Sequence, residues 1–417
     1  MLLEAFGLNA NSERRKHVLH GASIGRPFPD GCILYPEQDI SAFCANRYDM
    51  ILDSRLRRNL DWPLFALTYV IAVFGVVMLF SLTRFDPTVN YRKQILWIAL
   101  GTAGMIGVTA LDYHVYARFA KQLYSANIGL LLIVMRFAPH VKGAARWIRV
   151  GGFQFQPSEF AKLVVILTLT GFLAKRRETI GEWKTLLASF GYIAVPVALI
   201  FKQPDLGTAL VVMAIWGGMV FVAGANLKHL AAFAGIGLTL FVGLWHFGVL
   251  KEFQKERIRV VLGQSADAKG TGYHVYQARI AIGSGGMWGK GLLHSTQVRG
   301  GYIPEKDTDF IFTSVGEQLG FVGSVGLTLL YAFLLLRGTQ IIAAADEDYF
   351  GKLIAAGVTT MLAFHVIVNI GMNIGVMPVA GVPLPLVSAG GSNMILTFLC
   401  IGLLQSVLRH RHQLLFR

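Results

Sequence analysis

The stretch "PEKDTDFIF", residues 304–312, places three acids and one base directly before a long apolar run that ends near residue 336. This run exceeds the roughly 20 apolar residues that a membrane-spanning helix needs. Charged side chains at the edge of such a helix are costly and usually serve a function. The stretch therefore predicts a membrane-spanning helix and directs attention to the carboxylates at its beginning.

The whole chain is too apolar for a water-soluble enzyme. Of its 417 residues, 54% are hydrophobic and only 15% are charged, and its mean hydropathy is +0.54. The formal net charge of +14 comes from basic residues scattered between apolar runs, whereas nucleic-acid binding favours a basic stripe with aromatic residues. The composition predicts an all-α polytopic membrane protein and argues against nucleic acid as a partner.

Ten apolar runs are long enough to be membrane-spanning helices. They cover residues 62–82, 94–112, 121–138, 158–175, 185–202, 208–225, 229–248, 309–336, 352–372 and 391–408. Residues 1–54 are polar and lack the apolar core of a signal peptide, so we expect a disordered cytosolic extension. Residues 55–417 are expected to form one ten-helix membrane domain, with a long extracytoplasmic loop, 249–308, between the seventh and eighth spans.

An even number of spans places both termini on one side of the membrane. Arginine clusters at 55–58 and 409–417 indicate the cytosol, because cytoplasmic loops are enriched in basic residues. Four segments then emerge on the outer face of the cytoplasmic (inner) membrane, namely 139–157, 203–207, 249–308 and 373–390. They hold nearly all the loop glycines, prolines and unusual polar residues, so we expect the functional site there.

Two outer segments carry charged residues where a helix is predicted to begin. Glu159 and Lys162 are three residues apart and share one helix face, where they form either a structural ion pair at the lip of a cavity or a pair in the site. Asp205 lies in "KQPDLGTAL", residues 202–210, and helix capping is its simpler interpretation.

The long loop contains "GYHVYQARIAIGSGGMWGKGLLHSTQ", residues 272–297. Residues 273–282 are predicted to form a short helix in the membrane interface. Arg279 and Lys290 either bind an anion or extend toward lipid headgroups. The glycine-rich "IGSGG" lacks the preceding strand and the Lys-Ser/Thr ending of a nucleotide-binding loop.

The two aspartates near residue 309 are expected to have different roles, one in capping the helix and one in function. Asp307 is the expected N-cap of the eighth span, and Asp309 is expected one or two residues inside it, where an ionisable group indicates function. Glu317 either faces the same cavity or ties two helices together. The last outer segment, "MPVAGVPLPLVSAGGSN" at 377–393, is expected to be a re-entrant wall.

Five groups of motifs together resemble the SEDS family of ten-span cell-wall polymerases in order and topology. They are "RWI" with "FQPSEFAKL", "QPDLGTAL", "IAIGSGG" with "GKGLLHSTQ", "PEKDTDFIF" with "VGEQLG", and "MPVAGVPLPLVSAGGSN". The resemblance covers about residues 55–410 and is closer to the rod-shape branch, RodA, than to the division branch, FtsW. The chain departs from the family pattern at two positions. Asp307 stands where a His is usual, and Ala389 stands where a Tyr is usual.

The resemblance implies a peptidoglycan glycosyltransferase that polymerises lipid II into glycan strands on the outer leaflet during cell elongation. It also implies a class B penicillin-binding protein as partner, together with other membrane proteins of the elongation complex. By the same resemblance, Asp309 matches the family's essential acid. The alternatives are a lipid II flippase, for which ten spans with buried charge are also suited, and a non-catalytic scaffold.

Such a transfer needs a base for the acceptor hydroxyl and cations for the leaving pyrophosphate. We expect Asp309 to be the base of an inverting displacement, and the candidate cations are Arg146, Lys162, Arg279 and Lys290. The predicted substrate-binding residues also include Trp147, Glu159, Asp205, Glu305, Glu317 and Ser388. No ligand cluster with convincing spacing assigns a metal site, and a divalent cation such as Mg²⁺ stays open as a cofactor.

Overall fold

The computed structural model describes residues 60–410, except for 87–88, 138–146, 151–152, 249–251, 262–270 and 304. The predicted extension 1–54 and the candidate Arg146 lie outside the described residues. The longer helices are α3 (Trp62–Thr83), α4 (Tyr91–Ala110), α6 (Ala120–Phe137), α7 (Pro157–Ala174), α8 (Trp183–Lys202), α9 (Leu206–Val222), α10 (Leu227–His246), α13 (Ile311–Ala344), α14 (Tyr349–Asn373) and α15 (Gly391–His410). The shorter elements are α5 (His114–Arg118), β1 (Ile148–Val150), β2 (Phe153–Phe155), η3 (Arg177–Thr179), α11 (Glu252–Val261) and α12 (Thr271–Ser284).

Each of the ten predicted spans corresponds to one of the longer helices, which confirms the all-α fold class. Seven of these helices are long and apolar enough to cross a membrane: α3, α4, α7, α8, α13, α14 and α15. The other three differ in length or composition. α6 carries Lys121 and Arg136 near its two ends, and the apolar parts of α9 and α10, Leu206–Val222 and Leu227–Gly243, are shorter.

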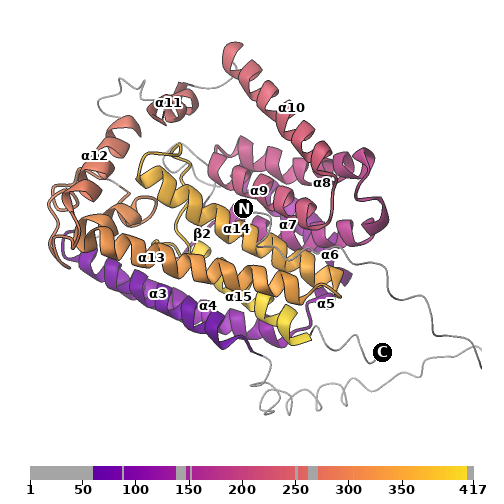
Figure 1. Cartoon of the computed structure of the whole chain (residues 1–417), viewed down its shortest axis with the longest axis horizontal. Helices are drawn as coiled ribbons and strands as arrows, with labels where there is room; N and C mark the ends of the chain where they lie inside the picture. Colours follow the sequence, from indigo (N-terminus) through magenta and orange to yellow (C-terminus); the bar gives the residue numbers. More distant parts are fainter. Residues whose placement is uncertain are drawn as a thin grey trace, which may run out of the picture. The chain divides into compact units, whose positions relative to one another are not determined.

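α14 and α15 form the interior of the bundle and are the most buried of the spanning helices. α15 packs along α4, while α14 packs against α13 on one side and against α9 and α7 on the other. α3 covers α13 (Figure 1). α10 packs lightly on α9 and extends away from the neighbouring helices (Figure 1), with apolar side chains such as Leu238 and Leu240 exposed.

Most of the predicted re-entrant stretch, 377–393, lies before α15 without regular secondary structure, and residues 384–388 within it are buried in the bundle. A Cβ at Gly75 of α3 would stand 2.7 Å from the carbonyl oxygen of Leu386, and one at Gly207 of α9 would stand 2.4 Å from that of Ala380. These two glycines therefore let the segment's backbone lie directly against α3 and α9. Irregular backbone inside a membrane protein is stable when protein surrounds it, as it does here.

α13 is interrupted at Gly320, whose φ of 66° and ψ of −159° are not helical. The interruption leaves backbone groups of α13 without their usual partners, and the segment after α12 supplies replacements. Lys290 N–H donates to the carbonyl of Glu317 (3.1 Å), and Phe321 N–H donates to the carbonyl of Gly286 (2.8 Å). The first part of α13, which follows Asp309, is thus separated from the long remainder and bonded to the loop.

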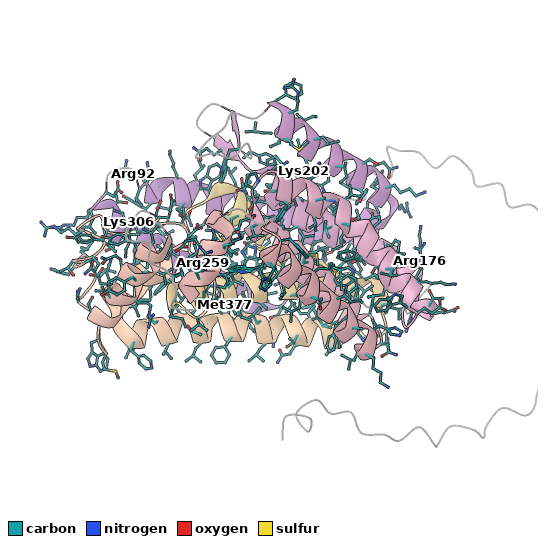
Figure 2. The ribbon with its side chains drawn as sticks, turned by 90° about the horizontal axis from the view of Figure 1, so that it is seen from above. Arg92, Arg176, Lys202, Arg259, Lys306 and Met377 are labelled. Atoms are coloured by element: carbon teal, nitrogen blue, oxygen red, sulfur yellow. The ribbon has the colours of Figure 1, made fainter. Side chains whose placement is uncertain are left out.

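The long loop between α10 and α13 contains two helices, α11 and α12. α12 confirms the short helix predicted over 273–282, whereas α11 was not predicted. The hairpin of β1 and β2 in the first outer segment, which pairs Ile148 with Phe155, was also not predicted. In Figure 2, Arg92 and Lys306 lie toward one end of the bundle and Arg176 lies toward the opposite end.

Candidate active site

The four segments predicted to lie on the outer face meet at one end of the bundle. Gln156 donates its Nε2 to the carboxylate of Asp205 (2.8 Å) and its backbone N–H to Ser392 Oγ (3.0 Å) at the beginning of α15. Ala389 donates its backbone N–H to the carbonyl of Asp307 (2.8 Å). These bonds join the first segment to the second and to α15, and the third to the fourth. Which side of the membrane this end faces stays a prediction.

Asp309 lies just before α13 and not inside it. α13 begins at Ile311, and its N-cap Phe310 makes no side-chain cap bond. The predictions that Asp307 caps this helix and that Asp309 lies within its first turn are therefore wrong. The reason is a local turn, in which the carbonyl of Glu305 accepts the N–H of Phe310 (2.9 Å) and delays the start of the helix.

Asp309 is a partly exposed residue that lies where the predicted outer segments meet. Its Oδ2 lies 3.5 Å from the position that a Cβ at Gly381 would take. The missing side chain at residue 381 therefore leaves room beside the carboxylate. The backbone carbonyl of Asp309 accepts bonds from the amides of Asn369 (2.9 Å) and Asn373 (3.0 Å), so the backbone of this partly exposed residue is held by α14.

Ser388 is completely buried and joins the last outer segment to the residues before Asp309. Its hydroxyl donates to the carbonyl of Thr308 (2.6 Å) and accepts the N–H of Leu384 (2.8 Å). Its own carbonyl accepts a bond from Gln94 (3.1 Å). These contacts make Ser388 a support for the backbone around Asp309, and its predicted contact with substrate stays a prediction.

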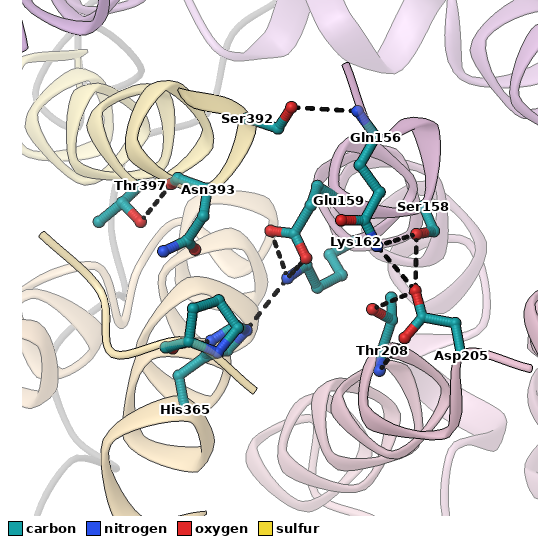
Figure 3. Close-up of polar contacts among 11 residues, drawn as sticks. Gln156, Ser158, Glu159, Lys162, Asp205, Thr208, His365, Ser392, Asn393 and Thr397 are labelled. Carbon is teal, nitrogen blue, oxygen red and sulfur yellow. Dashed lines mark hydrogen bonds and ion pairs between the residues drawn. The ribbon is translucent and has the colours of Figure 1, made fainter. Parts of the chain in front are cut away.

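Glu159 and Lys162 form the predicted ion pair on α7. Lys162 Nζ is 2.9 Å from both carboxylate oxygens and 3.1 Å from His365 Nε2 on α14 (Figure 3). His365 Nδ1 lies 3.1 Å from the carbonyl of Pro383, which can only accept, so Nδ1 carries the proton and Nε2 accepts from Lys162. All three side chains are buried. The pair therefore joins α7 to α14 and does not lie at the lip of a cavity.

Asp205 caps α9, which confirms the simpler interpretation of this residue. Its Oδ1 accepts the N–H of Thr208 (3.3 Å), and its Oδ2 accepts the hydroxyls of Thr208 (3.0 Å) and Ser158 (2.9 Å) and the amide of Gln156 (Figure 3). The residue is only 3% exposed. The carboxylate thus fastens the beginning of α7 to the beginning of α9.

Glu317 ties the long loop to α13. Its carboxylate accepts the backbone N–H groups of Thr296 (2.8 Å) and Gln297 (2.9 Å) and the Ser295 hydroxyl, and it pairs with Lys290 Nζ (2.8 Å). The buried carboxylate therefore holds a loop and not a second helix. Lys290 already neutralises Glu317, so its charge is only partly available to an anionic ligand.

The remaining candidates surround this end of the bundle at varied depths. Arg279 is exposed on α12 and packs over Gly375, close to the end of α14. Trp147 is half-buried just before β1. Glu305 is half-buried and accepts the hydroxyl of Thr308 (3.1 Å). The predicted contacts of these three side chains with substrate stay predictions.

Sequence reasoning missed several residues that build the site. Lys306 is nearly buried and pairs with Asp86 (3.1 Å) between α3 and α4. Burial raises the pKa of Asp307, and the nearby carboxylates of Glu305 and Asp86 raise it further. The spacing of His365, Asn369 and Asn373 was a readable signal, because polar side chains at every fourth position of an apolar run share one helix face.

The described residues contain no group of three or more His, Cys, Asp or Glu side chains that could hold a metal ion. The structure therefore assigns no ligands to the divalent cation left open by the sequence, and its involvement stays a prediction.

A family model agrees with this architecture over nearly the whole described region. The model of the FtsW/RodA/SpoVE family, described as a cell cycle protein, matches residues 61–413. The chain belongs to this family. Among curated relatives of FtsW/RodA/SpoVE type, "Peptidoglycan glycosyltransferase MrdB" of Escherichia coli K12 is 37% identical over 356 residues, which are 85% of this chain and 95% of the relative. "Peptidoglycan glycosyltransferase RodA" of Treponema pallidum is 33% identical, and the match covers 76% of this chain and 89% of the relative.

Solved structures of the family confirm the fold. A chain from the study "Structural coordination of polymerization and crosslinking by a peptidoglycan synthase complex" superposes with a TM-score of 0.72 at 32% identity, covering 85% of this chain and 99% of that one. The crystal structure of the rod shape determining protein RodA of Thermus thermophilus gives a TM-score of 0.64 at 32% identity with the same coverage. The resemblance read from the motifs is thereby confirmed at the level of the family.

Proposed function

We propose that the chain is a peptidoglycan glycosyltransferase that polymerises lipid II at the outer face of the cytoplasmic membrane during cell elongation. The observation that carries the proposal is the partly exposed residue Asp309, whose backbone carbonyl is held by two asparagine amides where the predicted outer segments meet. The activity for which the Escherichia coli and Treponema pallidum relatives are named supports the reaction class.

In the proposed reaction Asp309 is the general base. Its carboxylate takes the proton of the acceptor sugar's hydroxyl while that oxygen forms a bond to the donor's anomeric carbon. The bond from this carbon to the pyrophosphate breaks, and the polyprenyl pyrophosphate leaves with the bonding electrons. A single displacement inverts the anomeric configuration and needs no second carboxylate as nucleophile. The acidic side chains nearby that are already engaged, such as Glu317, fit structural roles better than nucleophilic ones.

The leaving pyrophosphate needs cationic contacts at the same end of the bundle. Among the described candidates, Arg279 is the most exposed, whereas Lys290 pairs with Glu317 and Lys162 is completely buried with Glu159. Arg279 packs over Gly375, two residues beyond Asn373, which bonds the carbonyl of Asp309. Of the described candidates, Arg279 is therefore the residue to test first for pyrophosphate binding.

The proposed partner is a class B penicillin-binding protein that cross-links the new strands. Its support is the solved relative from a peptidoglycan synthase complex that coordinates polymerisation and crosslinking. Other membrane proteins of the elongation complex, and a location with both termini in the cytosol, belong to the same proposal.

One assay tests the activity. Purified protein in liposomes receives lipid II, and glycan product and flipped lipid are measured together. We expect glycan strands from the unmodified protein and none from Asp309→Asn, because the amide cannot accept the proton. The matched control is Asp346→Asn, which removes an exposed carboxylate beyond the far end of α13 and should leave polymerisation unchanged. Flipped lipid without strands would favour the flippase, neither product would favour a scaffold, and strands from Asp309→Asn would remove this residue from the mechanism.

A further inference from the structure

α14 carries a stripe of three buried polar side chains, His365, Asn369 and Asn373, at successive fourth positions. They are 2%, 0% and 0% exposed, and the spacing places them on one face of the helix. Buried polar groups in a membrane-spanning helix are costly unless each is bonded. The partners of this stripe therefore show what its polar groups do.

The two asparagines converge on one atom, the carbonyl oxygen of Asp309. Asn369 Nδ2 donates to it (2.9 Å) and also to the carbonyl of Val382 (2.8 Å). Asn373 Nδ2 donates to the Asp309 carbonyl from one helical turn further along (3.0 Å). Two amide donors on one carbonyl fix both its position and the direction of its peptide plane, from which the Asp309 side chain extends.

Asn373 also fixes the beginning of α13 from outside that helix. The N-cap Phe310 offers no side-chain acceptor, and the Oδ1 of Asn373 accepts the N–H (3.1 Å) and the hydroxyl (2.6 Å) of Thr313. An acceptor for a first-turn N–H is the usual work of an N-cap side chain. The N–H of Thr313 also donates to the carbonyl of Phe310 (3.1 Å), so Asn373 adds a second acceptor there and holds the first turn of α13, just after Asp309, against α14.

His365 and Asn369 hold the opposite wall beside the carboxylate. His365 Nδ1 donates to the carbonyl of Pro383, and Asn369 donates to that of Val382. These carbonyls directly follow Gly381, whose missing side chain leaves the space beside Asp309 Oδ2. One face of α14 therefore sets both the residue that carries the carboxylate and the backbone that faces it.

We propose that Asn369 and Asn373 are positioning residues that hold Asp309 in the geometry of proton transfer. The inference rests on the proposed role of Asp309 as general base. Neither asparagine touches the reacting atoms, so each acts through the Asp309 backbone. A displacement of about 1 Å at a reacting group can lower the rate about 100-fold, and losing one of two amide donors should permit a smaller one.

The test compares Asn369→Ala and Asn373→Ala with the unmodified protein in lipid II polymerisation. The rate is expressed per lipid II-binding site, counted by native mass spectrometry, so that a loss of folded protein does not imitate a loss of catalysis. We expect kcat per site to fall about 10- to 100-fold in each variant, with KM and lipid II binding changed less than about threefold. Asn127→Ala is the matched control, because Asn127 is a buried asparagine on α6 whose Nδ2 has no hydrogen-bond partner among the described residues, and it should keep the full rate.

Unchanged kcat per site in both alanine variants would overturn the proposal, as would a loss that appears entirely in KM. If the alanine variants do not fold, Thr313→Val decides, because it keeps the size of the side chain and removes only the hydroxyl bonded to Asn373. We expect it to lower kcat a few-fold, and no change would overturn the proposal. Asp309→Asn, measured beside them, separates the two hypotheses: if it stays active, the proposed base is wrong, whatever the asparagine variants do.

Discussion

Lys162 Nζ lies 2.9 Å from both carboxylate oxygens of Glu159, and both side chains are buried inside the helix bundle. From the sequence, an ion pair with a structural role and an ion pair in the functional site were equally favoured interpretations. Because the ammonium has no exposed surface and also bonds His365, it is placed to act on the site through α14 rather than by touching substrate.

Replacing only Lys162 should be strongly destabilising. Lys162→Met leaves the Glu159 carboxylate buried without its cation, a loss that typically costs about 3–5 kcal/mol. Glu159→Gln combined with Lys162→Met removes both charges and should recover most of that stability, since buried ion pairs are often replaceable. Thermal unfolding in detergent measures both effects. We expect the double variant to stay slow in polymerisation because the bond to His365 is gone, and a double variant as unstable as the single one would contradict this account.

The cap at Asp205 should matter more than an ordinary helix cap. Asp205→Ala removes the acceptor of α9 and the acceptor of the buried Ser158 hydroxyl, and it takes one of the two acceptors of Gln156 Nε2, which keeps its bond to Ser158 Oγ. A buried donor left without a partner typically costs about 1–3 kcal/mol. Asn226 caps α10 through the N–H of Lys228 at an exposed position, so Asn226→Ala is the matched control and should cost about 1 kcal/mol. Equal shifts in the unfolding temperatures of the two variants would show that the network around Asp205 adds nothing.

The helices were predictable because lipid restricts what a spanning segment can be. A run of apolar residues must satisfy its own backbone, so run length alone located all ten helices. The ends were harder. α13 extends to Ala344, beyond the predicted end at 336, because Arg337 is paired with Asp61 (2.7 Å) and need not end the helix.

The site was predictable only in part, because its supports are contacts between distant segments. The motif around residue 309 singled out Asp309 as the candidate base, which stays a prediction. Spacing alone could not show that Glu305 turns the chain before α13 or that amides from α14 reach residue 309. Capping rules use neighbours in sequence, and Asn373 caps from a position 60 residues away. The hairpin of β1 and β2 was missed because two strands of three residues are too short for a periodic signal.

The break in α13 should be intolerant of any side chain. A Cβ at Gly320 would stand 2.3 Å from the backbone nitrogen of Gly289, at a φ of +66° that side chains rarely adopt. Gly320→Ala should therefore lower the unfolding temperature clearly, since the conformational penalty alone is about 1 kcal/mol or more. Gly326 lies on the same helix, and no described residue stands within 4 Å of the position that a Cβ there would take, so Gly326→Ala should leave stability unchanged or slightly higher. Equal effects of the two substitutions would show that the break is not required.

The carboxyl group of Asp307 should make stability depend on pH in the direction opposite to that of a salt-bridged acid. Burial, together with Glu305 and Asp86, raises its pKa in the folded protein. A group that binds its proton more tightly when folded lowers the free energy of unfolding as pH rises from its unfolded pKa, about 4, through its folded pKa. Asp307→Asn removes this loss, so the variant should unfold at a higher temperature than the unmodified protein at neutral pH, and the difference should vanish near pH 4.

Asp346 provides the control with the opposite sign. Its hydrogen bond to Lys352 lowers the pKa of this exposed carboxyl, so its contribution to stability is present above the ordinary aspartate range and is lost as pH falls through the folded pKa. Asp346→Asn should therefore lower the unfolding temperature slightly at neutral pH, where Asp307→Asn raises it. Unfolding temperatures measured from pH 4 to pH 8 compare the two variants, and parallel curves for Asp307→Asn and the unmodified protein would mean that this carboxyl titrates alike in the folded and unfolded states.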